Sequence, residues 1–369
     1  MASIEGQKVI IENEGGKTEA IIGRGVIEHT VEIASSYTSL VLMVSSRVAS
    51  LYSSIMPRLE TLDKNTVVLN VQDGESLKSI KNYQKIMRVL VEREVDRHSL
   101  LIYIGGGTVG DLAGFVAATY KRGIDLLAVP TTLLAQVDSS VGGKNGINFA
   151  GVKNVIGTFY QPRVILDEIS FLLSAPDEVL RNGLPEVIKY AFIGEQRIGA
   201  LLSEAGGLSK LRSEQALMDI VSWSVKYKAS VTAGDYRDRS GLRAALNFGH
   251  TVGHALEAAS GNSIGHGEAV ALGMLVESFA GQRYGITPRG THDKIADLIS
   301  MYGIRLPDLS EYRVDGLVRY MMNDKKTTSG TIRFYVPAQS NTVSEMPLSQ
   351  DQARRVLREY IQNQGGISH

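Results

Sequence analysis

Five short apolar runs in the first half of the 369-residue chain constrain its fold more than any other feature. They are Leu40–Val44, Val67–Val71, Leu100–Ile104, Ile124–Val129 and Val164–Leu166. Mainly apolar runs of this length suit strands that are buried on both faces of a parallel sheet. Helical patterns at Ser76–Glu92 and Asp111–Thr119 separate three of these runs, which predicts parallel strands joined by right-handed crossovers. Lys8–Glu12 and Glu19–Gly23 are expected to add a hairpin.

After Pro176 the sequence changes to helical periodicity. It predicts a short β pair at Thr331–Val336 and Ser340–Ser344, and helices at Asp177–Ile193, Ser213–Ala233, Leu246–Ser260, Glu268–Tyr284, His292–Tyr302, Val314–Asn323 and Ser349–Gln364. A chain of this length exceeds one ordinary core. We therefore expect an N-terminal α/β Rossmann-like domain over residues 1–175 and a mainly α-helical domain over residues 176–369.

The composition excludes several classes of function. Lysine plus arginine equals aspartate plus glutamate, at 39 each, so the chain lacks the basic excess that nucleic-acid binding needs. There is no cysteine, which excludes disulfides, thiolate nucleophiles and cysteine metal sites. The N-terminus has no signal-peptide pattern, and no apolar run is long enough to span a bilayer. A cytoplasmic protein with no membrane or nucleic-acid partner is expected.

Three of the seven histidines lie close together in the sequence. His250 and His254 are four residues apart in a helical pattern, so both imidazoles would lie on one face. His266 follows a turn-like segment that lets the chain fold back. Three imidazoles, or two with a carboxylate such as Glu186, suit a catalytic zinc site with one open position. Alternatively, the histidines are ordinary surface residues, and Glu186 pairs with Lys189 on a helix.

A glycine-rich loop, Gly105–Asp111, follows one predicted strand and opens a helix. Glycines let the backbone approach a pyrophosphate, and the helix N-terminus offers free N–H donors. The alternative is a tight turn that needs positive φ. The next polar stretch, Val129–Pro162, suits a phosphorylated or carboxylated substrate; otherwise it is a solvated loop. Its polar groups are Thr131, Thr132, Asp138, Lys144, Asn148, Lys153 and Asn154.

Seven motifs together resemble the 3-dehydroquinate synthase family, and their order and spacing match from about Asp73 to Val336. They are GGGTVGDLAGF, YKRG, VPTTLLAQVDSSVGGK, KNVIGTFYQP, LPEVIKYA, GLRAALNFGHTVGHALE and HGEAVALGM. The resemblance implies a homodimeric enzyme with NAD and zinc or cobalt. Such an enzyme converts 3-deoxy-D-arabino-heptulosonate 7-phosphate, a phosphorylated sugar acid, to 3-dehydroquinate in the shikimate pathway.

The same resemblance implies the roles of individual residues. The metal ligands would be Glu186, His250 and His266, with His254 beside the substrate as a proton-transfer group. NAD would contact Asp73, Gly74, Glu75, Ser76, Leu77, Lys78, Gly106, Gly107, Thr108, Val109, Gly110, Asp111, Thr131, Thr132, Lys144 and Lys153. Substrate contacts would come from Asp138, Lys144, Lys153, Asn154, Lys189, Arg243, Asn247 and Lys326, and from Arg122 of the neighbouring subunit.

The sequence departs from the family pattern in four places. Asn145 replaces the usual threonine, and Phe149-Ala150 replaces a usual His-Pro. One extra residue lies within Asp235–Gly241, which bears on the role of Lys228. Residues 171–176 differ from the usual pattern at a nucleotide contact, and Ser45 stands where an acidic or amide residue is expected. A carboxylate there would bind the ribose and repel the 2′-phosphate of NADP, unless Asp73 or Glu75 takes that role.

Three other functions compete with this interpretation. A cyclase for another sugar phosphate would differ in the substrate it turns over. A metal-dependent polyol dehydrogenase would accumulate NADH, whereas a cyclase returns the hydride in each cycle. A binding or regulatory protein on the same fold would hold no metal.

Overall fold

The computed structural model describes residues 6–48, 56–261, 263–322, 330–339 and 342–365. It divides into two compact units. The first unit contains Met1–Pro176 and Arg212–Arg239, and the second contains Asp177–Leu211 and Ser240–His369. The predicted division after residue 175 treats each domain as continuous, whereas the structure groups the segment Arg212–Arg239 with the first unit.

A seven-stranded sheet forms the centre of the first unit, in the order β1-β2-β9-β6-β5-β3-β4. Only β1 and β2 pair antiparallel, and the other neighbours are parallel. The strands are β1 (Gln7–Asn13), β2 (Gly16–Gly23), β3 (Ser39–Ser45), β4 (Asn65–Val71), β5 (Leu100–Gly105), β6 (Asp125–Pro130) and β9 (Val164–Glu168). All five apolar runs are therefore strands of one sheet, which confirms the predicted α/β class.

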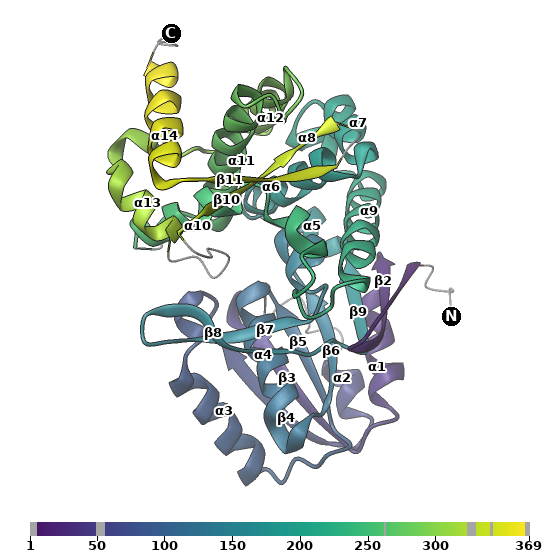
Figure 1. The fold of residues 1–369 in the computed structure, drawn as a ribbon. Coiled ribbons are helices and arrows are strands. Elements are labelled where there is room, and N and C mark those ends of the chain that lie inside the picture. The colour runs from purple at the N-terminus through teal and green to yellow at the C-terminus, as the bar shows by residue number, and fades with distance from the viewer. Residues whose placement is uncertain (1–5, 49–55, 262, 323–329, 340–341, 366–369) are drawn as a thin grey trace. The chain divides into compact units, whose positions relative to one another are not determined.

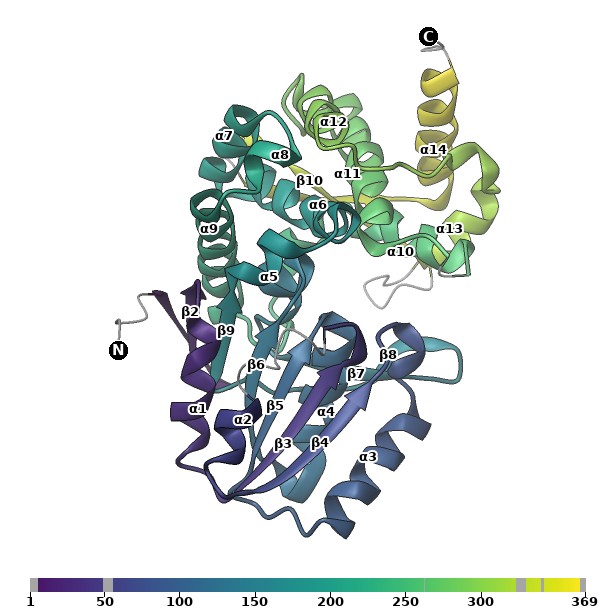
Figure 2. The same cartoon turned by 180° about the vertical axis from the view of Figure 1, so that it is seen from behind.

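Helices cover both faces of this sheet, whose central strands β3, β5 and β6 are buried almost throughout. The edge strand β4 is mostly exposed or half-buried, so the burial expected for Val67–Val71 is wrong. Leu40, Leu42 and Val44 on β3 pack with Ala34 of α1 (His29–Ala34) and Leu59 of α2 (Met56–Glu60). On the other face, α4 (Gly107–Thr119) contacts β3, β5 and β6. Figures 1 and 2 show these helices around the sheet, with α3 (Ile80–Glu92) at its β4 side.

The order of the strands defines where a ligand would lie in the first unit. From β3 the chain passes to β4 on one side and then to β5 on the other side of β3. Open α/β sheets bind ligands outside the carboxyl ends of strands at such a reversal. Ser45 ends β3 and Gly105 ends β5, so the glycine loop lies at this position.

The polar stretch after β6 is more ordered than a solvated loop. It forms a π-helical turn over Ala135–Ser139, followed by the hairpin of β7 (Lys144–Phe149) and β8 (Val152–Phe159). β7 contacts α4 and α3. Two helices, α5 (Ile169–Ser174) and α9 (Glu214–Ala233), complete the first unit.

The second unit is mainly helical, as predicted. It contains α6 (Asp177–Ile193), α7 (Gln196–Ala205), α8 (Leu208–Leu211), α10 (His250–Ala259), α11 (His266–Arg283), α12 (Thr291–Met301), α13 (Val314–Met322), α14 (Gln350–Gly365) and the antiparallel pair β10 (Ile332–Pro337) and β11 (Val343–Leu348). No helix among the described residues is both long enough and apolar enough to cross a membrane.

Two predicted elements of the second unit have different bounds in the structure. The single helix expected over Leu246–Ser260 is wrong, because a 3-10 helix ends at Asn247 and α10 begins at His250. Gly249 separates them with a φ of 80°, a left-handed conformation that interrupts a helix. The second strand of the β pair lies at Val343–Leu348 and not at Ser340–Ser344; residues 340–341 are outside the described part of the chain.

Candidate active site

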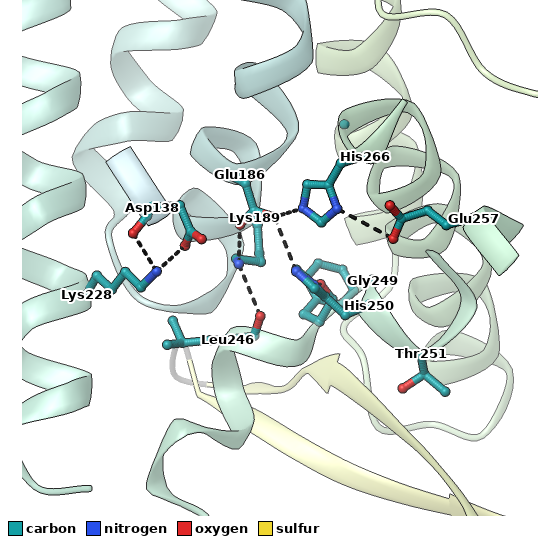
Figure 3. A network of polar contacts seen from close by, with 12 residues as sticks. Asp138, Glu186, Lys189, Lys228, Leu246, Gly249, His250, Thr251, Glu257 and His266 are labelled. Atoms are coloured by element: carbon teal, nitrogen blue, oxygen red, sulfur yellow. Dashed lines mark hydrogen bonds and ion pairs between the residues drawn. The ribbon is translucent and has the colours of Figure 1, made fainter. Parts of the chain in front are cut away.

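Three ionisable side chains of the second unit converge at the starts of two helices. Glu186 lies on α6, His250 is the first residue of α10, and His266 is the first residue of α11. One nitrogen or oxygen from each lies within 4.8 Å of the others. The Nε2 atoms of both histidines are 3.3 Å from Oε1 of Glu186. Figure 3 draws both contacts as dashed lines. This is the arrangement that a shared metal site requires.

A close approach of α6 and α11 brings Glu186 to His266. A Cβ atom on Gly267 would overlap the backbone of Asn182, so only glycine permits this approach. The N–H of Gly267 donates to Oδ1 of Asn182 at 3.0 Å. Asn182 precedes Glu186 by one helical turn, so the same face of α6 supplies both the packing contact and the carboxylate.

The other ring nitrogens of the two histidines have their own acceptors. Nδ1 of His250 lies 3.1 Å from the carbonyl oxygen of Phe248, and Nδ1 of His266 lies 3.7 Å from Oε2 of Glu257. A ring that carries a single proton, on Nδ1, presents its Nε2 lone pair to the point near Glu186. Two imidazole nitrogens and one carboxylate oxygen fit a three-ligand zinc or cobalt site with an open position.

Lys189 lies one turn beyond Glu186 and is 1% exposed. Its Nζ forms an ion pair with Oε2 of Glu186 and donates to the carbonyl oxygen of Leu246 at 3.1 Å. Glu186 therefore pairs with Lys189 through its Oε2, in the interior and not on a helix surface, while its Oε1 faces the two histidines.

These neighbours set the protonation of the cluster. Burial raises the pKa of Glu186, but Lys189 and the histidines more than offset it and bring that pKa well below its usual range. Burial, with Lys189 adding to it, lowers the pKa of His250 to about 4. Burial also lowers the pKa of His266, but Glu186 and Glu257 outweigh it and raise the pKa to about 10.

The other predicted site residues of the second unit lie around the same helix start. His254 is exposed one turn along α10, with its ring centre 5.3 Å from that of His250. Arg243 is buried and Asn247 is partly buried in the 3-10 helix Leu242–Asn247. Lys326 lies outside the described residues.

In the first unit, the glycine loop is shaped by close contacts and not by positive φ. Gly106 is the N-cap of α4 with a φ of −78°, so the alternative of a positive-φ turn is wrong. A Cβ on Gly107 would lie 2.9 Å from Oγ of Ser139, and one on Gly110 would lie 3.0 Å from the ring of Tyr103. Gly106 has no side chain that could cap α4, and helix starts of this kind can bind anions through their first N–H groups.

The segment Asp73–Lys78 lies beside this loop. Its Gly74 N–H donates to Oγ1 of Thr108 at 3.4 Å. Nζ of Lys78 is 2.6 Å from Oδ2 of Asp111 and 3.4 Å from Oε1 of Glu75. Burial raises the pKa of Asp111, and Lys78 opposes that effect. The structure thus brings together the predicted nucleotide contacts on both sides of the loop.

Ser45 is buried and its Oγ donates to Oδ2 of Asp73. The carboxylate of Asp73 therefore stands next to the position where the family pattern expects an acidic or amide residue. It comes from the end of β4, the neighbouring strand. The alternative in which Asp73 serves the ribose agrees with this geometry.

The β7–β8 hairpin joins the same region through Asn148. Its side-chain amide donates to Oε1 of Glu75 at 2.8 Å, and its N–H donates to the carbonyl oxygen of Lys78, also at 2.8 Å. Asn154 donates its N–H to Oδ1 of Asn148 at 2.9 Å, and Lys153 precedes it, partly buried, on β8. Thr131 and Thr132 follow β6, and the N–H of Thr131 donates to the carbonyl oxygen of Gly105.

Two lysines of the first unit pair with aspartates. Nζ of Lys228 on α9 lies 2.7 Å from both the carbonyl oxygen and Oδ1 of Asp138. Figure 3 draws these two contacts as dashed lines. The extra residue in Asp235–Gly241 thus leaves Lys228 beside a predicted substrate contact. Within that same segment, Asp238 lies 2.5 Å from Nζ of Lys144. These pairs keep the lysine charges at fixed positions.

Asn145 and Arg122, two further residues noted in the sequence, both lie in the first unit. Asn145, in place of the usual threonine, donates to the carbonyl oxygens of Gly143 and Tyr160 and packs against Gly114 of α4. Asn145 therefore joins the two ends of the hairpin and packs the hairpin against α4. Arg122 is exposed in the turn between α4 and β6, with a φ of 69°.

The sequence did not identify several residues that contact the candidate site residues. Glu257 is the clearest, because its spacing of seven from His250 puts both on one face of α10. That spacing could have identified it. Asn182, Phe248 and Asp238 gave no such signal, since each acts through a backbone group or through a contact distant in the sequence.

Comparisons with known proteins identify the family of the chain. Residues 68–182 match the family model of the 3-dehydroquinate synthase N-terminal domain, and residues 183–327 match that of its C-terminal domain. The curated 3-dehydroquinate synthase of Thermoplasma volcanium is 46% identical over 340 residues, covering 92% of this chain and 93% of that protein. The chain therefore belongs to the 3-dehydroquinate synthase family and is an enzyme.

Solved structures show the same fold at low sequence identity. A 2-deoxy-scyllo-inosose synthase, solved with carbaglucose-6-phosphate, NAD+ and Co2+, has a TM-score of 0.84 at 23% identity and covers 96% of this chain and 99% of its own. The 2-epi-5-epi-valiolone synthase of Streptomyces hygroscopicus, with NAD+ and Zn2+ bound, has a TM-score of 0.83 at 21% identity, covering 93% and 96%. At these identities the likeness establishes the fold alone.

Proposed function

We propose that this enzyme converts 3-deoxy-D-arabino-heptulosonate 7-phosphate to 3-dehydroquinate and phosphate, with NAD and a divalent metal as cofactors. It would thus act as a carbon–oxygen lyase of the shikimate pathway. The observation that carries the proposal is the cluster of Glu186, His250 and His266, whose donor atoms lie within 4.8 Å of one another. Family membership supplies the reaction, and the cluster supplies the site where its metal would bind.

The residues of each unit fit one of the two cofactors. Glu186, His250 and His266 would hold zinc or cobalt. The first turn of α4, with Gly106, Gly107 and Thr108, would bind the NAD pyrophosphate, because its backbone N–H groups are donors at a positive helix end. Asp73 would accept hydrogen bonds from the ribose.

When bound, NAD supplies a hydride acceptor that is regenerated in each turnover, and the metal supplies a Lewis-acid charge. The chain's own residues bind and orient the substrate. Lys153, Asn154, Arg243 and Asn247 would bind its phosphate, carboxylate and hydroxyl groups. Asp138 and Lys228 form an ion pair. Together they would form hydrogen bonds with further oxygen atoms of the substrate.

His254 would move a proton in this reaction. It is exposed on α10 one turn from His250, whose Nε2 is directed to Glu186. A solvent-accessible imidazole at that position is close to the proposed metal ligands without being one of them. Proton transfer by such a group is a common use of histidine in enzymes.

We also propose a homodimer in which Arg122 contacts the substrate phosphate bound to the partner subunit. Arg122 is exposed in a turn beside Lys121, and a guanidinium suits bidentate contact with phosphate. This proposal rests on the family resemblance and on the exposure of the turn.

The test is a substrate panel assayed for released phosphate with NAD and zinc present. Heptulosonate phosphate should be turned over, and the product should be 3-dehydroquinate by NMR. Glucose 6-phosphate and sedoheptulose 7-phosphate serve as controls for the other cyclase reactions. Turnover of either control without turnover of heptulosonate phosphate would contradict the proposed substrate.

A further inference from the structure

A buried carboxylate in the second unit has no role in the mechanism above. Glu277 lies in the middle of α11 and is 0% exposed. It accepts hydrogen bonds from the backbone N–H groups of Gly249 at 2.9 Å, Thr251 at 3.1 Å, Val252 at 3.2 Å and Tyr335 at 3.4 Å. Three of these four groups belong to the start of α10, the helix that begins with His250.

Glycines allow Glu277 to reach this helix start. A Cβ on Gly273 would overlap the carbonyl oxygen of Gly249, and a Cβ on Gly249 would lie 2.6 Å from the side chain of Met274. A Cβ on Gly253 would lie 3.1 Å from the carbonyl oxygen of Ala269. The two helices therefore pack with their backbones in near contact, and the carboxylate of Glu277 covers the N-terminus of α10.

One peptide group connects Glu277 to the histidine. The N–H of Gly249 and the carbonyl group of Phe248 belong to the same planar peptide unit. Oε2 of Glu277 accepts from that N–H at 2.9 Å, and the Phe248 carbonyl oxygen lies 3.1 Å from Nδ1 of His250. The connection therefore runs from carboxylate to peptide to Nδ1, while Nε2 is directed to Glu186.

We propose that Glu277 is a positioning residue for the metal ligand His250 and acts on it through the Phe248–Gly249 peptide. The inference rests on the proposed function, because it assumes that His250 binds a metal. A carboxylate on the N–H side of a peptide polarises the group, so that its carbonyl oxygen becomes a better acceptor. A proton held on Nδ1 fixes the ring and makes Nε2 a better ligand.

The charge of Glu277 has a second effect. The N-terminus of a helix carries a partial positive charge, which disfavours a cation nearby. His250 and His266 each stand at such an N-terminus. Glu277 places a negative charge against the start of α10, and at the start of α11 Oε2 of Glu268 accepts from the N–H of Gly265 at 3.4 Å. Both helix starts are thereby made more compatible with a divalent metal.

At His266 a carboxylate faces the Nδ1 atom of the ring directly. Its Nδ1 faces Oε2 of Glu257 at 3.7 Å, with no peptide between them. Each proposed histidine ligand therefore has an acceptor at Nδ1 that depends on a carboxylate, one directly and one through a peptide group. Such outer partners of metal ligands commonly change metal affinity by about 10–100-fold.

The main experiment separates this role from ordinary stabilisation by a buried carboxylate. Glu168 in the first unit offers a matched control, because it is 1% exposed and accepts from the N–H groups of Gly25, Ile27 and Ser170 at 3.0–3.2 Å. Both Glu277→Gln and Glu168→Gln remove the charge and keep the shape. Zinc and cobalt affinities of the full chain are measured by competition with a chromophoric chelator, alongside the melting temperature.

Glu277→Gln should weaken metal binding by about 10–100-fold and change the absorption spectrum of the cobalt form. Glu168→Gln should lower the melting temperature and leave metal affinity within twofold. Equal metal affinities for Glu277→Gln and the unmodified protein would overturn the inference. If the unmodified chain itself bound neither zinc nor cobalt, the proposed function would also fail. The two failures are distinguishable, because the inference alone fails when the unmodified chain and Glu277→Gln bind metal equally well.

A second measurement needs no substitution at Glu277 and covers the case in which that variant does not fold. In the unmodified, metal-free protein, ¹⁵N-histidine NMR should show the neutral ring of His250 protonated on Nδ1. The His250→Gln variant assigns its signals by their loss. Protonation on Nε2 would show that the Phe248 carbonyl does not hold the ring and would overturn the inference.

Discussion

The glycine loop of the first unit and the histidine cluster of the second unit are built by different physical means. The loop depends on the backbone: glycines permit close contacts, and the N-cap Gly106 has no side chain to occupy the start of α4. The cluster depends on charged side chains removed from water, with Glu186 and Glu277 0% exposed and Lys189 1% exposed. Each such charge is compensated by a partner, as burial requires.

The difference follows from the ligand that each region would bind. A pyrophosphate is large and can be bound by many weak backbone donors, so a helix end is sufficient. A metal ion needs three ligands at fixed distances, and buried partners hold them there. Changes at the cluster should therefore reduce function far more than changes of the same size at the loop.

The largest effect is expected from the cluster itself. Glu186→Gln and His266→Ala each remove a direct ligand, so metal affinity should fall by more than the roughly 100-fold seen for outer partners. Phosphate release should be abolished, as it should after chelation of the unmodified enzyme. Zinc or cobalt should restore the chelated enzyme but not the variants at equal metal concentration. Full activity of a verified metal-free preparation would contradict this site.

The next effect concerns proton transfer without metal loss. His254→Ala should slow turnover by roughly 10²–10⁴-fold, the range for a lost proton-transfer group. The bound metal should be unchanged, because Nε2 of His250 and of His266 already face Glu186. Metal analysis of the purified variant beside its turnover number checks both parts. Loss of metal would mean that His254 is itself a ligand.

A dimer test follows. Arg122→Ala subunits and Glu186→Gln subunits should each be inactive alone. If Arg122 acts on the partner's substrate, a mixture should form hybrid dimers in which one of the two sites keeps both Arg122 and Glu186. Under random exchange this restores up to about a quarter of the activity. Subunit exchange is verified by native mass spectrometry. Exchange without recovered activity would refute the shared site.

At the glycine loop and in the helix α4 that it opens, the effect should be smaller and should divide between folding and binding. Gly114→Ala would overlap the side chain of Asn145, so it should destabilise the protein by about 1–3 kcal/mol. Gly106→Ala meets only ordinary contact at 3.4 Å from Thr132, so it should fold normally and weaken NAD binding. Melting temperatures and NAD titrations check this pair. The metal affinity of both variants should be unchanged. A loss of metal affinity in either variant would contradict the separate roles of the glycine loop and the histidine cluster.

The smallest effect is expected at the proposed ribose contact. Since Ser45 donates to Asp73, Asp73→Asn should narrow the preference for NAD over NADP, by about 1–3 kcal/mol if one charge-assisted hydrogen bond is lost. Ser45→Ala should narrow it less. Ser45→Asp, which on the sequence alone would sharpen the preference for NAD, should instead place two carboxylates together and weaken binding of both nucleotides. An unchanged ratio of dissociation constants in all three variants would show that neither residue faces the ribose.

Much of this architecture follows from local sequence. The five apolar runs predicted the parallel strands, and the spacing of His250 and His254 predicted one helical face. What local patterns could not supply was pairing between distant segments. Lys144 with Asp238, Asn148 with Glu75, and Gly249 with Glu277 are joined only by the fold.

The β7–β8 hairpin shows a second limit of sequence reasoning. Its exposed strand β8 alternates polar and apolar residues only weakly. Gly157 interrupts the pattern of β8, and Gly146 interrupts that of β7. Those glycines permit the close packing of the two strands, as a Cβ on Gly157 would lie 2.7 Å from the carbonyl oxygen of Asn145. A region rich in glycine and polar side chains therefore resembled a loop, although it forms an antiparallel pair with one shift of register between Ile147 and Phe149.

The most direct test of the account is the balance between phosphate and reduced cofactor. The enzyme is incubated with zinc, excess heptulosonate phosphate and much less NAD than substrate, while phosphate and NADH are followed together. The account predicts that released phosphate far exceeds the NAD supplied and that NADH does not accumulate, because the hydride is returned in every turnover. NADH formed in proportion to consumed substrate, with turnover stopping when NAD is exhausted, would contradict it and indicate a dehydrogenase.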